Sequence, residues 1–177
     1  MIRRLAFQAA VAALVSAPAV AQDLPRPRPS QHGSVSQDVA LTTITLEYDR
    51  PVARGREIYG GIVEWDVVST PGANRATWVD FSTPVTFAGA ALDAGRYGIW
   101  HIPHESEPWE VILVRSWDTH HSFYPFESEA ARVRVLPEAG AHMETLGFYF
   151  PMVGEYEAVL RLHWASTILP LRIEVPR

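Results

Sequence analysis

Cysteine and lysine are both missing from this 177-residue chain. Without cysteine, the protein can have no disulfide, thiolate nucleophile, iron–sulfur cluster or cysteine-ligated zinc. Its 15 basic residues are therefore all arginine, and 20 acidic residues outnumber them, which gives a formal net charge of −5. Binding to nucleic acid needs a basic surface that displaces counterions. We therefore expect no nucleic-acid partner.

Long apolar runs are also scarce, with one exception at the N-terminus, residues 5–20. Arg3 and Arg4 precede this run, and an A-x-A sequence ends at Ala21. This order is typical of a secretory signal peptide, which we assign to residues 1–21 with cleavage after Ala21. The run is interrupted by Pro18 and is shorter than the roughly 20 residues of a membrane span. We expect a periplasmic or secreted protein with no membrane span after cleavage. The arginine pair leaves open whether the general or the twin-arginine route exports it.

Helical periodicity is weak throughout the mature chain, whereas alternation of apolar and polar residues is strong. It predicts strands at 42–48, 156–164 and 169–175, and further strands at 77–82, 84–87, 97–102, 109–115, 132–136 and 145–150. Turn residues separate these segments, notably at 89–95, 103–108, 137–140 and 151–154. About nine short strands with this punctuation predict an all-β domain, a single antiparallel β-sandwich. A closed β-barrel is the alternative, because the number of strands does not separate the two.

The length fits one domain. Residues 22–34 contain alternating Pro and Arg, which predicts an extended lead-in. We assign residues 35–177 to the β-sandwich domain.

Four histidines raise the question of a metal or catalytic site: His101, His104, His120 and His121. Neighbouring residues on a strand point to opposite faces, and neither H-E-x-x-H nor H-x-H is present. We therefore interpret these histidines as solvated loop side chains and expect neither a metal nor a cofactor. The sequence also lacks the G-x-S-x-G elbow of serine hydrolases and the glycine-rich phosphate-binding loops. We assign no catalytic residue.

The most irregular part of the chain is residues 50–77, here called the 50–77 loop. A loop of this length inside one domain is often functional. Arg50, Arg56 and Asn74 are its candidate binding residues, because fixed guanidinium groups near glycine-rich backbone can hold a carboxylate or phosphate. The alternative is that these side chains only tie the loop to the sandwich.

Several short motifs resemble those of a secreted bacterial family called domain of unknown function 2911. They are Tyr48-Asp49-Arg50-Pro51, Gly55-Arg56-x-Ile58-x-Gly60-Gly61, Gly72-Ala73-Asn74-x-Ala76-Thr77, Leu92-x-Ala94-Gly95-x-Tyr97 and Trp109-x-Val111-Ile112. The similarity runs from about Val35 to Val175. It implies an exported all-β domain and brings no activity with it. Where the family usually has Trp-Arg-Thr before Gly-Ala-Asn, this chain has Ser69-Thr70-Pro71.

Together these features favour an exported, non-enzymatic binding domain of the cell envelope. Its expected partner is a small anionic ligand or an envelope component. The alternative is a small hydrolase or metal-dependent enzyme that uses His and Glu residues of the loops.

Overall fold

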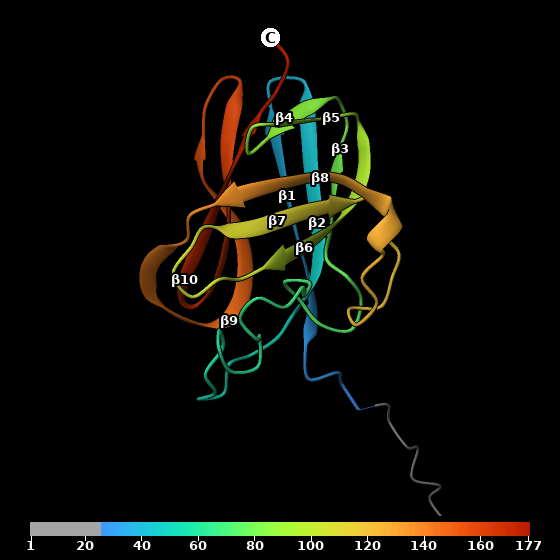
Figure 1. The fold of residues 1–177 in the computed structure, drawn as a ribbon. Helices are drawn as coiled ribbons and strands as arrows, with labels where there is room; N and C mark the ends of the chain where they lie inside the picture. The colour runs from blue at the N-terminus through green and yellow to red at the C-terminus, as the bar shows by residue number, and fades with distance from the viewer. Residues whose placement is uncertain (1–25) are drawn as a thin grey trace, which may run out of the picture.

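A computed structural model describes residues 26–177 of the chain (Figure 1). The expected signal peptide, residues 1–21, lies outside the described residues. The described part contains ten strands and one short 3₁₀ turn, Phe126–Ser128. The strands are β1 Gln31–Val39, β2 Thr42–Arg50, β3 Trp78–Phe81, β4 Val85–Phe87, β5 Ala90–Leu92, β6 Gly95–Ile102, β7 Trp109–Val114, β8 Glu129–Val135, β9 Glu138–Val153 and β10 Glu157–Glu174. Within residues 26–177 no helix is long and apolar enough to cross a membrane.

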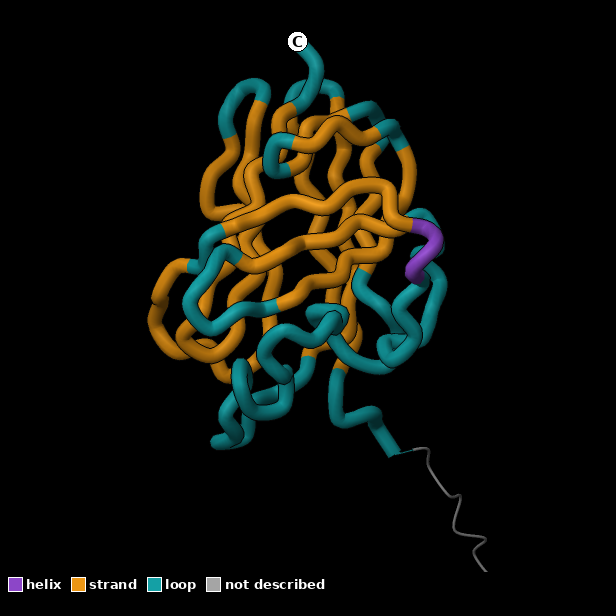
Figure 2. Tube along the Cα trace, viewed as in Figure 1, coloured by secondary structure: helices purple, strands orange, loops and turns teal. Residues whose placement is uncertain are grey.

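The strands form two antiparallel sheets that do not close into a barrel. One sheet has six strands in the order β1-β2-β3-β6-β7-β8, and the other has four in the order β5-β4-β10-β9. The predicted antiparallel β-sandwich is therefore confirmed. Loops gather at the end of the sandwich where the chain enters β1 (Figure 2).

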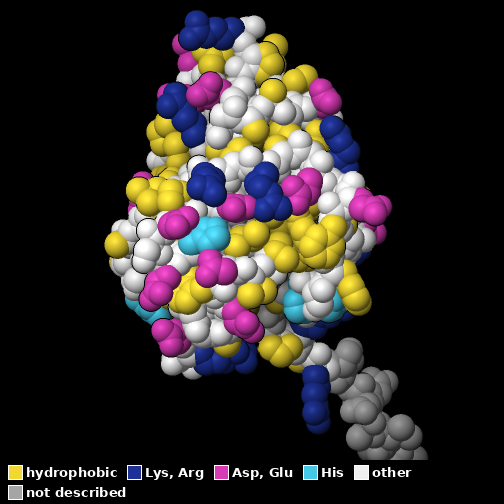
Figure 3. All heavy atoms as spheres, viewed as in Figure 1, with side chains coloured by type: hydrophobic (Ala, Val, Ile, Leu, Met, Phe, Trp, Pro, Cys, Tyr) yellow, Lys and Arg dark blue, Asp and Glu magenta, His cyan; other side chains and the backbone are white. Residues whose placement is uncertain are grey.

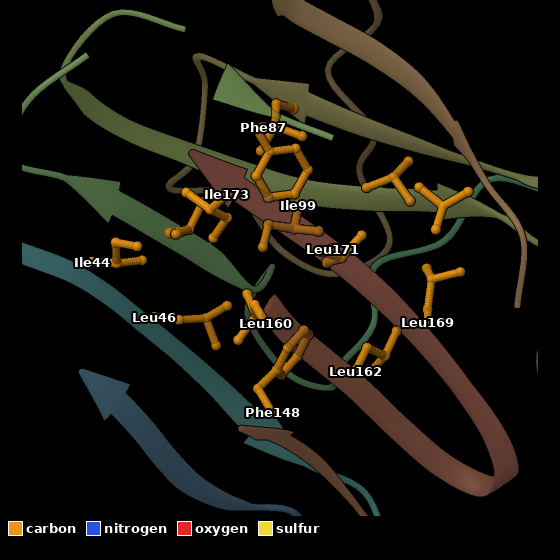
Figure 4. Packing of buried hydrophobic residues seen from close by; sticks show 14 of the residues in the cluster. Ile44, Leu46, Phe87, Ile99, Phe148, Leu160, Leu162, Leu169, Leu171 and Ile173 are labelled. Atoms are coloured by element: carbon orange, nitrogen blue, oxygen red, sulfur yellow. The ribbon is translucent and has the colours of Figure 1, made fainter. Parts of the chain in front are cut away.

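The core lies between the sheets and follows from the alternation of residues along each strand. Ile44 and Leu46 of β2 point toward Leu160, Leu171 and Ile173 of β10, and all five are fully or almost fully buried (Figure 4). Each such aliphatic side chain contributes roughly 1.5–3 kcal/mol of burial free energy.

β6 from Tyr97 to His101 and β7 from Val111 to Val114 are buried on both faces, which explains the apolar run in β7. A second, smaller cluster covers the outer face, where Trp100 of β6 packs with Ile112 and Val114 of β7 under Tyr124. Hydrophobic side chains gather on this face of the molecule (Figure 3). The side chains of Tyr97, Ile99 and His101 therefore alternate with Trp100 and point inward.

Two strands were not evident from the sequence. β1 has the polar pattern of a sheet edge, and it begins at Gln31, inside the predicted lead-in. It pairs with β2 along its whole length through a turn at Ala40 and Leu41, where Ala40 has φ 50°. Ala-Leu is not a usual turn sequence, so it gave no hairpin signal. β5 has only three residues and lies in the segment predicted as a turn.

β9 and β10 are much longer than expected. The strands predicted at 156–164 and 169–175 are one bent strand, β10, whose pairing with β9 shifts register around Ala165 (φ 50°). The turns predicted at 137–140 and 151–154 lie largely within β9. β9 is an edge strand, where Pro151 need not donate a ladder hydrogen bond.

Candidate functional site

The 50–77 loop folds back against one end of the sandwich, as the blue-green segment below the sheets in Figure 1. Its first part is tied to β9: the backbone N–H of Ala53 donates to Glu144 O at 2.8 Å, and that of Leu146 donates to Pro51 O at 3.0 Å. Ile58 and Tyr59 are buried in the main core. The loop therefore closes this end of the sandwich.

The last part of the loop pairs with β6. Ser69 and His101 exchange two backbone hydrogen bonds, of 2.9 and 2.8 Å. The buried hydroxyl of Thr70 donates to Ile99 O at 2.9 Å and accepts from the backbone N–H of Thr77 at 3.1 Å. Gly72 is needed beside this network, because a Cβ there would lie 2.6 Å from Thr77 Oγ1. The loop is thus fixed by specific bonds at both ends.

Arg50, the first of the three sequence-predicted site residues, lies at the end of β2. Its Nε donates to Leu146 O at 3.1 Å, and its guanidinium carbon lies 6.0 Å from the centre of the Tyr48 ring. Asn74 has φ 59°, and its side-chain amide donates to Asp49 Oδ2 at 3.0 Å. Neither residue lines the cavity that lies between this loop and the ends of the two sheets.

Arg56 is the one of the three that lines this cavity. Its Nε donates to Ala53 O at 2.9 Å and its Nη2 to Val52 O at 2.7 Å, so the guanidinium also holds a loop turn. The structure thus places the three predicted residues on one loop without directing them at a common point.

A cavity of about 400 Å³ lies between the 50–77 loop and the ends of the two sheets. His101 reaches it from β6, Trp164 from the bend of β10, and Tyr59 and Ser69 from the loop. His101 is 2% exposed and Trp164 4% exposed. The exposed Arg54 and Arg56 lie at its rim. Its size is at the small end of the range for binding sites of organic molecules.

Buried polar atoms without a partner are concentrated in residues that line this cavity. Within residues 26–177, seven buried side-chain nitrogen or oxygen atoms have no hydrogen-bond partner, and four of them belong to cavity-lining residues. These four are Ser69 Oγ, His101 Nδ1, His101 Nε2 and Trp164 Nε1. A buried polar atom without a hydrogen-bond partner lowers the free energy of unfolding by about 1–3 kcal/mol. Several such atoms in neighbouring residues therefore call for an explanation.

The family model described as "Protein of unknown function (DUF2911)" matches residues 30–173, which include the cavity and most of the sandwich. The chain belongs to this family. The resemblance seen in the sequence is therefore confirmed, and the family's description supplies no activity. No curated protein and no solved structure gives a significant match.

Aromatic rings form the inner wall of the cavity in this DUF2911 member. The Tyr59 ring lies 4.5 Å from that of Trp109 and 6.5 Å from that of Trp164, measured between ring centres. The His101 ring stacks on Trp109 at 5.7 Å with an angle of 21° between the ring planes. Trp109 Nε1 donates to His104 O at 2.9 Å. The indole nitrogen of Trp164 therefore differs from that of its neighbour in lacking a partner within the described chain.

The inner wall carries no charge at neutral pH. Burial lowers the pKa of His101 to about 4, and the nearby backbone of Ser69 opposes this shift only in part. Burial raises the pKa of Tyr59 above its usual range. His101 is thus a neutral imidazole, and Tyr59 is a neutral phenol.

The other histidines lie elsewhere or at the edge. His104 Nδ1 lies 2.5 Å from Asp66 Oδ1 at the surface, and the rings of His120 and His121 lie 4.3 Å apart. Burial lowers the pKa of His121, and His120 adds to the shift. Within residues 26–177 no three His or acidic side chains are placed to hold a metal ion. The interpretation of all four as solvated loop residues is wrong for His101, which is buried at the end of an inward-facing row.

Sequence reasoning missed Tyr59, Ser69, His101 and Trp164 as site residues. It assigned Trp164 to a core strand, which is correct for its ring but does not reveal the unpartnered nitrogen. His101 follows Tyr97 and Ile99 at two-residue spacing along β6, and this period was the available signal for an inward position. Ser69 pairs with His101 although the two positions are 32 residues apart, and no sequence motif indicates this pairing.

Proposed function

We propose that this protein is a binding domain for a small organic molecule, held in the cavity between the 50–77 loop and the two sheets. The observation that carries the proposal is that Ser69, His101 and Trp164 line one cavity, and that Ser69 Oγ, both His101 ring nitrogens and Trp164 Nε1 are buried without partners in the described chain. A ligand with polar atoms in this space would supply hydrogen-bond partners for these groups. The N-terminal sequence supports a location in the periplasm or outside the cell.

Binding is favoured over hydrolysis by the geometry of the two residues best suited to chemistry. A serine nucleophile needs a hydrogen bond to its base, and the base needs a third group that orients it. Ser69 Oγ and the His101 ring nitrogens have no such bonds within residues 26–177. The carboxylate nearest a histidine, that of Asp66, contacts His104 at the surface instead.

The test is a ligand-observed NMR screen of a chemically diverse fragment set against the mature chain, residues 22–177. Ala73 lines the cavity, so Ala73→Phe should fill it and suppress binding of the fragments. Ala91, an exposed alanine of β5 outside this cavity, provides the matched control Ala91→Phe. We expect fragments that bind the unchanged protein and Ala91→Phe but not Ala73→Phe. Fragments that bind all three proteins alike, or the absence of any bound fragment, would contradict the proposal.

A further inference from the structure

The cavity has a neutral, polar inner end and a positively charged rim. The inner end holds the uncharged Ser69, His101 and Trp164. The rim holds the guanidinium groups of Arg54 and Arg56. This division restricts the chemistry of the molecule that fits, and the inference rests on the binding function proposed above.

The inner end disfavours a charged group. An ion transferred there would lose its water without meeting an opposite charge, which is costly in a buried site. Trp164 Nε1 can only donate a hydrogen bond, whereas the Ser69 hydroxyl and a neutral imidazole can each donate and accept. The inserted group must therefore be neutral and must accept at least one hydrogen bond, as a hydroxyl, carbonyl or ring nitrogen does.

Between the two ends, the wall is made of aromatic rings. Tyr59, His101 and Trp164 line the cavity, and Tyr59 and His101 pack against Trp109 behind them. Ring faces and edges of this kind pack well against a flat ring of similar size. A cavity of about 400 Å³ accommodates one small ring with its substituents.

The rim favours an anion. Arg54 has φ 54°, and its backbone N–H donates to Glu144 Oε1 at 2.6 Å, which fixes the residue's position. Within residues 26–177 its guanidinium makes no hydrogen bond or close ion pair, and its charge interacts at longer range with the Glu144 carboxylate. Two guanidinium nitrogens of Arg56 are held by backbone carbonyls, so this charge is fixed in place. Forked guanidinium donors match the oxygens of a carboxylate or a phosphate.

We infer that the ligand is a small ring-containing organic acid: its neutral hydrogen-bonding end contacts Ser69, His101 and Trp164, and its carboxylate or phosphate lies at Arg54 and Arg56.

Four compounds separate these features in isothermal titration calorimetry. 4-Hydroxybenzoate carries both ends, and 4-hydroxyphenyl phosphate exchanges its carboxylate for a phosphate. 4-Hydroxybenzamide lacks the anion, and benzoate lacks the neutral polar end. We expect one or both of the first two compounds to bind, and the tighter of them identifies the acid. Loss of either end should weaken binding roughly tenfold or more, since a hydrogen bond to a charged or buried group contributes about 1–3 kcal/mol.

Two variants with matched controls assign each end to its residues. Arg54→Gln should weaken the binding of 4-hydroxybenzoate and leave that of 4-hydroxybenzamide unchanged. Arg115→Gln, at an exposed arginine outside this cavity, should change neither affinity. Trp164→Phe should reduce the affinity of 4-hydroxybenzoate to that of benzoate. Trp100→Phe removes another buried, unpartnered indole nitrogen, in the cluster on the outer face, and should leave both affinities unchanged.

Failure of this inference is distinguishable from failure of the binding function. If 4-hydroxybenzamide binds as tightly as 4-hydroxybenzoate and Arg54→Gln changes neither affinity, the ligand is not an acid and the inference is wrong. The inference is also wrong if none of the four compounds binds while other fragments bind the unchanged protein and not Ala73→Phe. If no fragment binds in that cavity at all, the proposed function itself fails.

Discussion

Ser69 and His101 are joined by two backbone hydrogen bonds of 2.9 and 2.8 Å, yet the Ser69 hydroxyl and both imidazole nitrogens have no partner within residues 26–177. The backbone pairing fixes where the two side chains lie. The ligand proposed above would supply the partners that these polar atoms lack.

Ser69 and its neighbour Thr70 should respond differently to loss of the hydroxyl. Ser69→Ala removes an unpartnered group and should leave the free energy of unfolding of the ligand-free protein unchanged or slightly higher. Thr70→Val removes a hydroxyl that bonds to both Ile99 and Thr77 and should lower it by about 1–3 kcal/mol. Urea denaturation of both variants measures the difference. Equal destabilisation would show that the Ser69 hydroxyl has a partner in the free protein.

His101 should make the protein less stable in acid. Its pKa in the folded protein is about 4 against an ordinary 6.5, so between these values the unfolded chain binds a proton that the folded chain does not. The free energy of unfolding should therefore fall as the pH drops from 6.5 to 4, with a contribution from this residue of about 3 kcal/mol. His101→Phe keeps the ring against Trp109 and should remove that part of the slope. An unchanged slope in the variant would contradict the burial of a neutral His101.

Arg54 and Arg56 should have different effects on stability. Arg56 bonds to Val52 and Ala53, so Arg56→Ala should lower the free energy of unfolding by about 1 kcal/mol. Arg54→Ala should leave it nearly unchanged, because the exposed guanidinium of Arg54 makes no hydrogen bond or close ion pair within residues 26–177 and its interaction with Glu144 is screened by water. Thermal unfolding with and without 4-hydroxybenzoate gives both quantities. A large loss of stability on Arg56→Ala, with no stabilisation of the unchanged protein by any anion, would leave Arg56 with a purely structural role.

The register of β10 can be tested with an inward leucine. Leu171 is buried between the sheets, and Leu171→Asp places an unpaired charge there, which should prevent folding. Leu160→Asp should act in the same way. Leu41 at the β1–β2 turn is 95% exposed, and Leu41→Asp is the matched control that should keep the melting transition. Retention of the transition in both core variants would show that the strand register is wrong.

Alternating residues were enough to predict the fold class and the core, because β2, β3 and most of β10 keep one face buried. β1 was missed because both of its faces carry mainly polar residues. Its turn, Ala40 and Leu41, also contains no usual turn residue. The bend at Ala165 was missed for a similar reason: a positive φ at alanine has no sequence signal.

The sequence pointed to the loop that lines the cavity, whereas it did not point to the buried polar residues there. Arg50, Arg56 and Asn74 stood out by residue type, and all three bond to carbonyl or carboxylate oxygens of the chain itself. Ser69, His101 and Trp164 come from the loop and from both sheets. Only the packing of one sheet on the other brings them to one cavity, and a single sequence contains no direct record of that packing.

The most direct test of the central claim is the NMR signal of the Trp164 indole N–H, assigned by comparison with Trp164→Phe. On titration with 4-hydroxybenzoate, or with the tightest fragment that Ala73→Phe excludes, this signal should move downfield as the nitrogen gains a hydrogen-bond acceptor. The indole signal of Trp100, which is equally buried but lies on the outer face, should stay in place. A saturated binder that leaves the Trp164 signal unmoved would contradict the claim that these unpartnered groups form a ligand site.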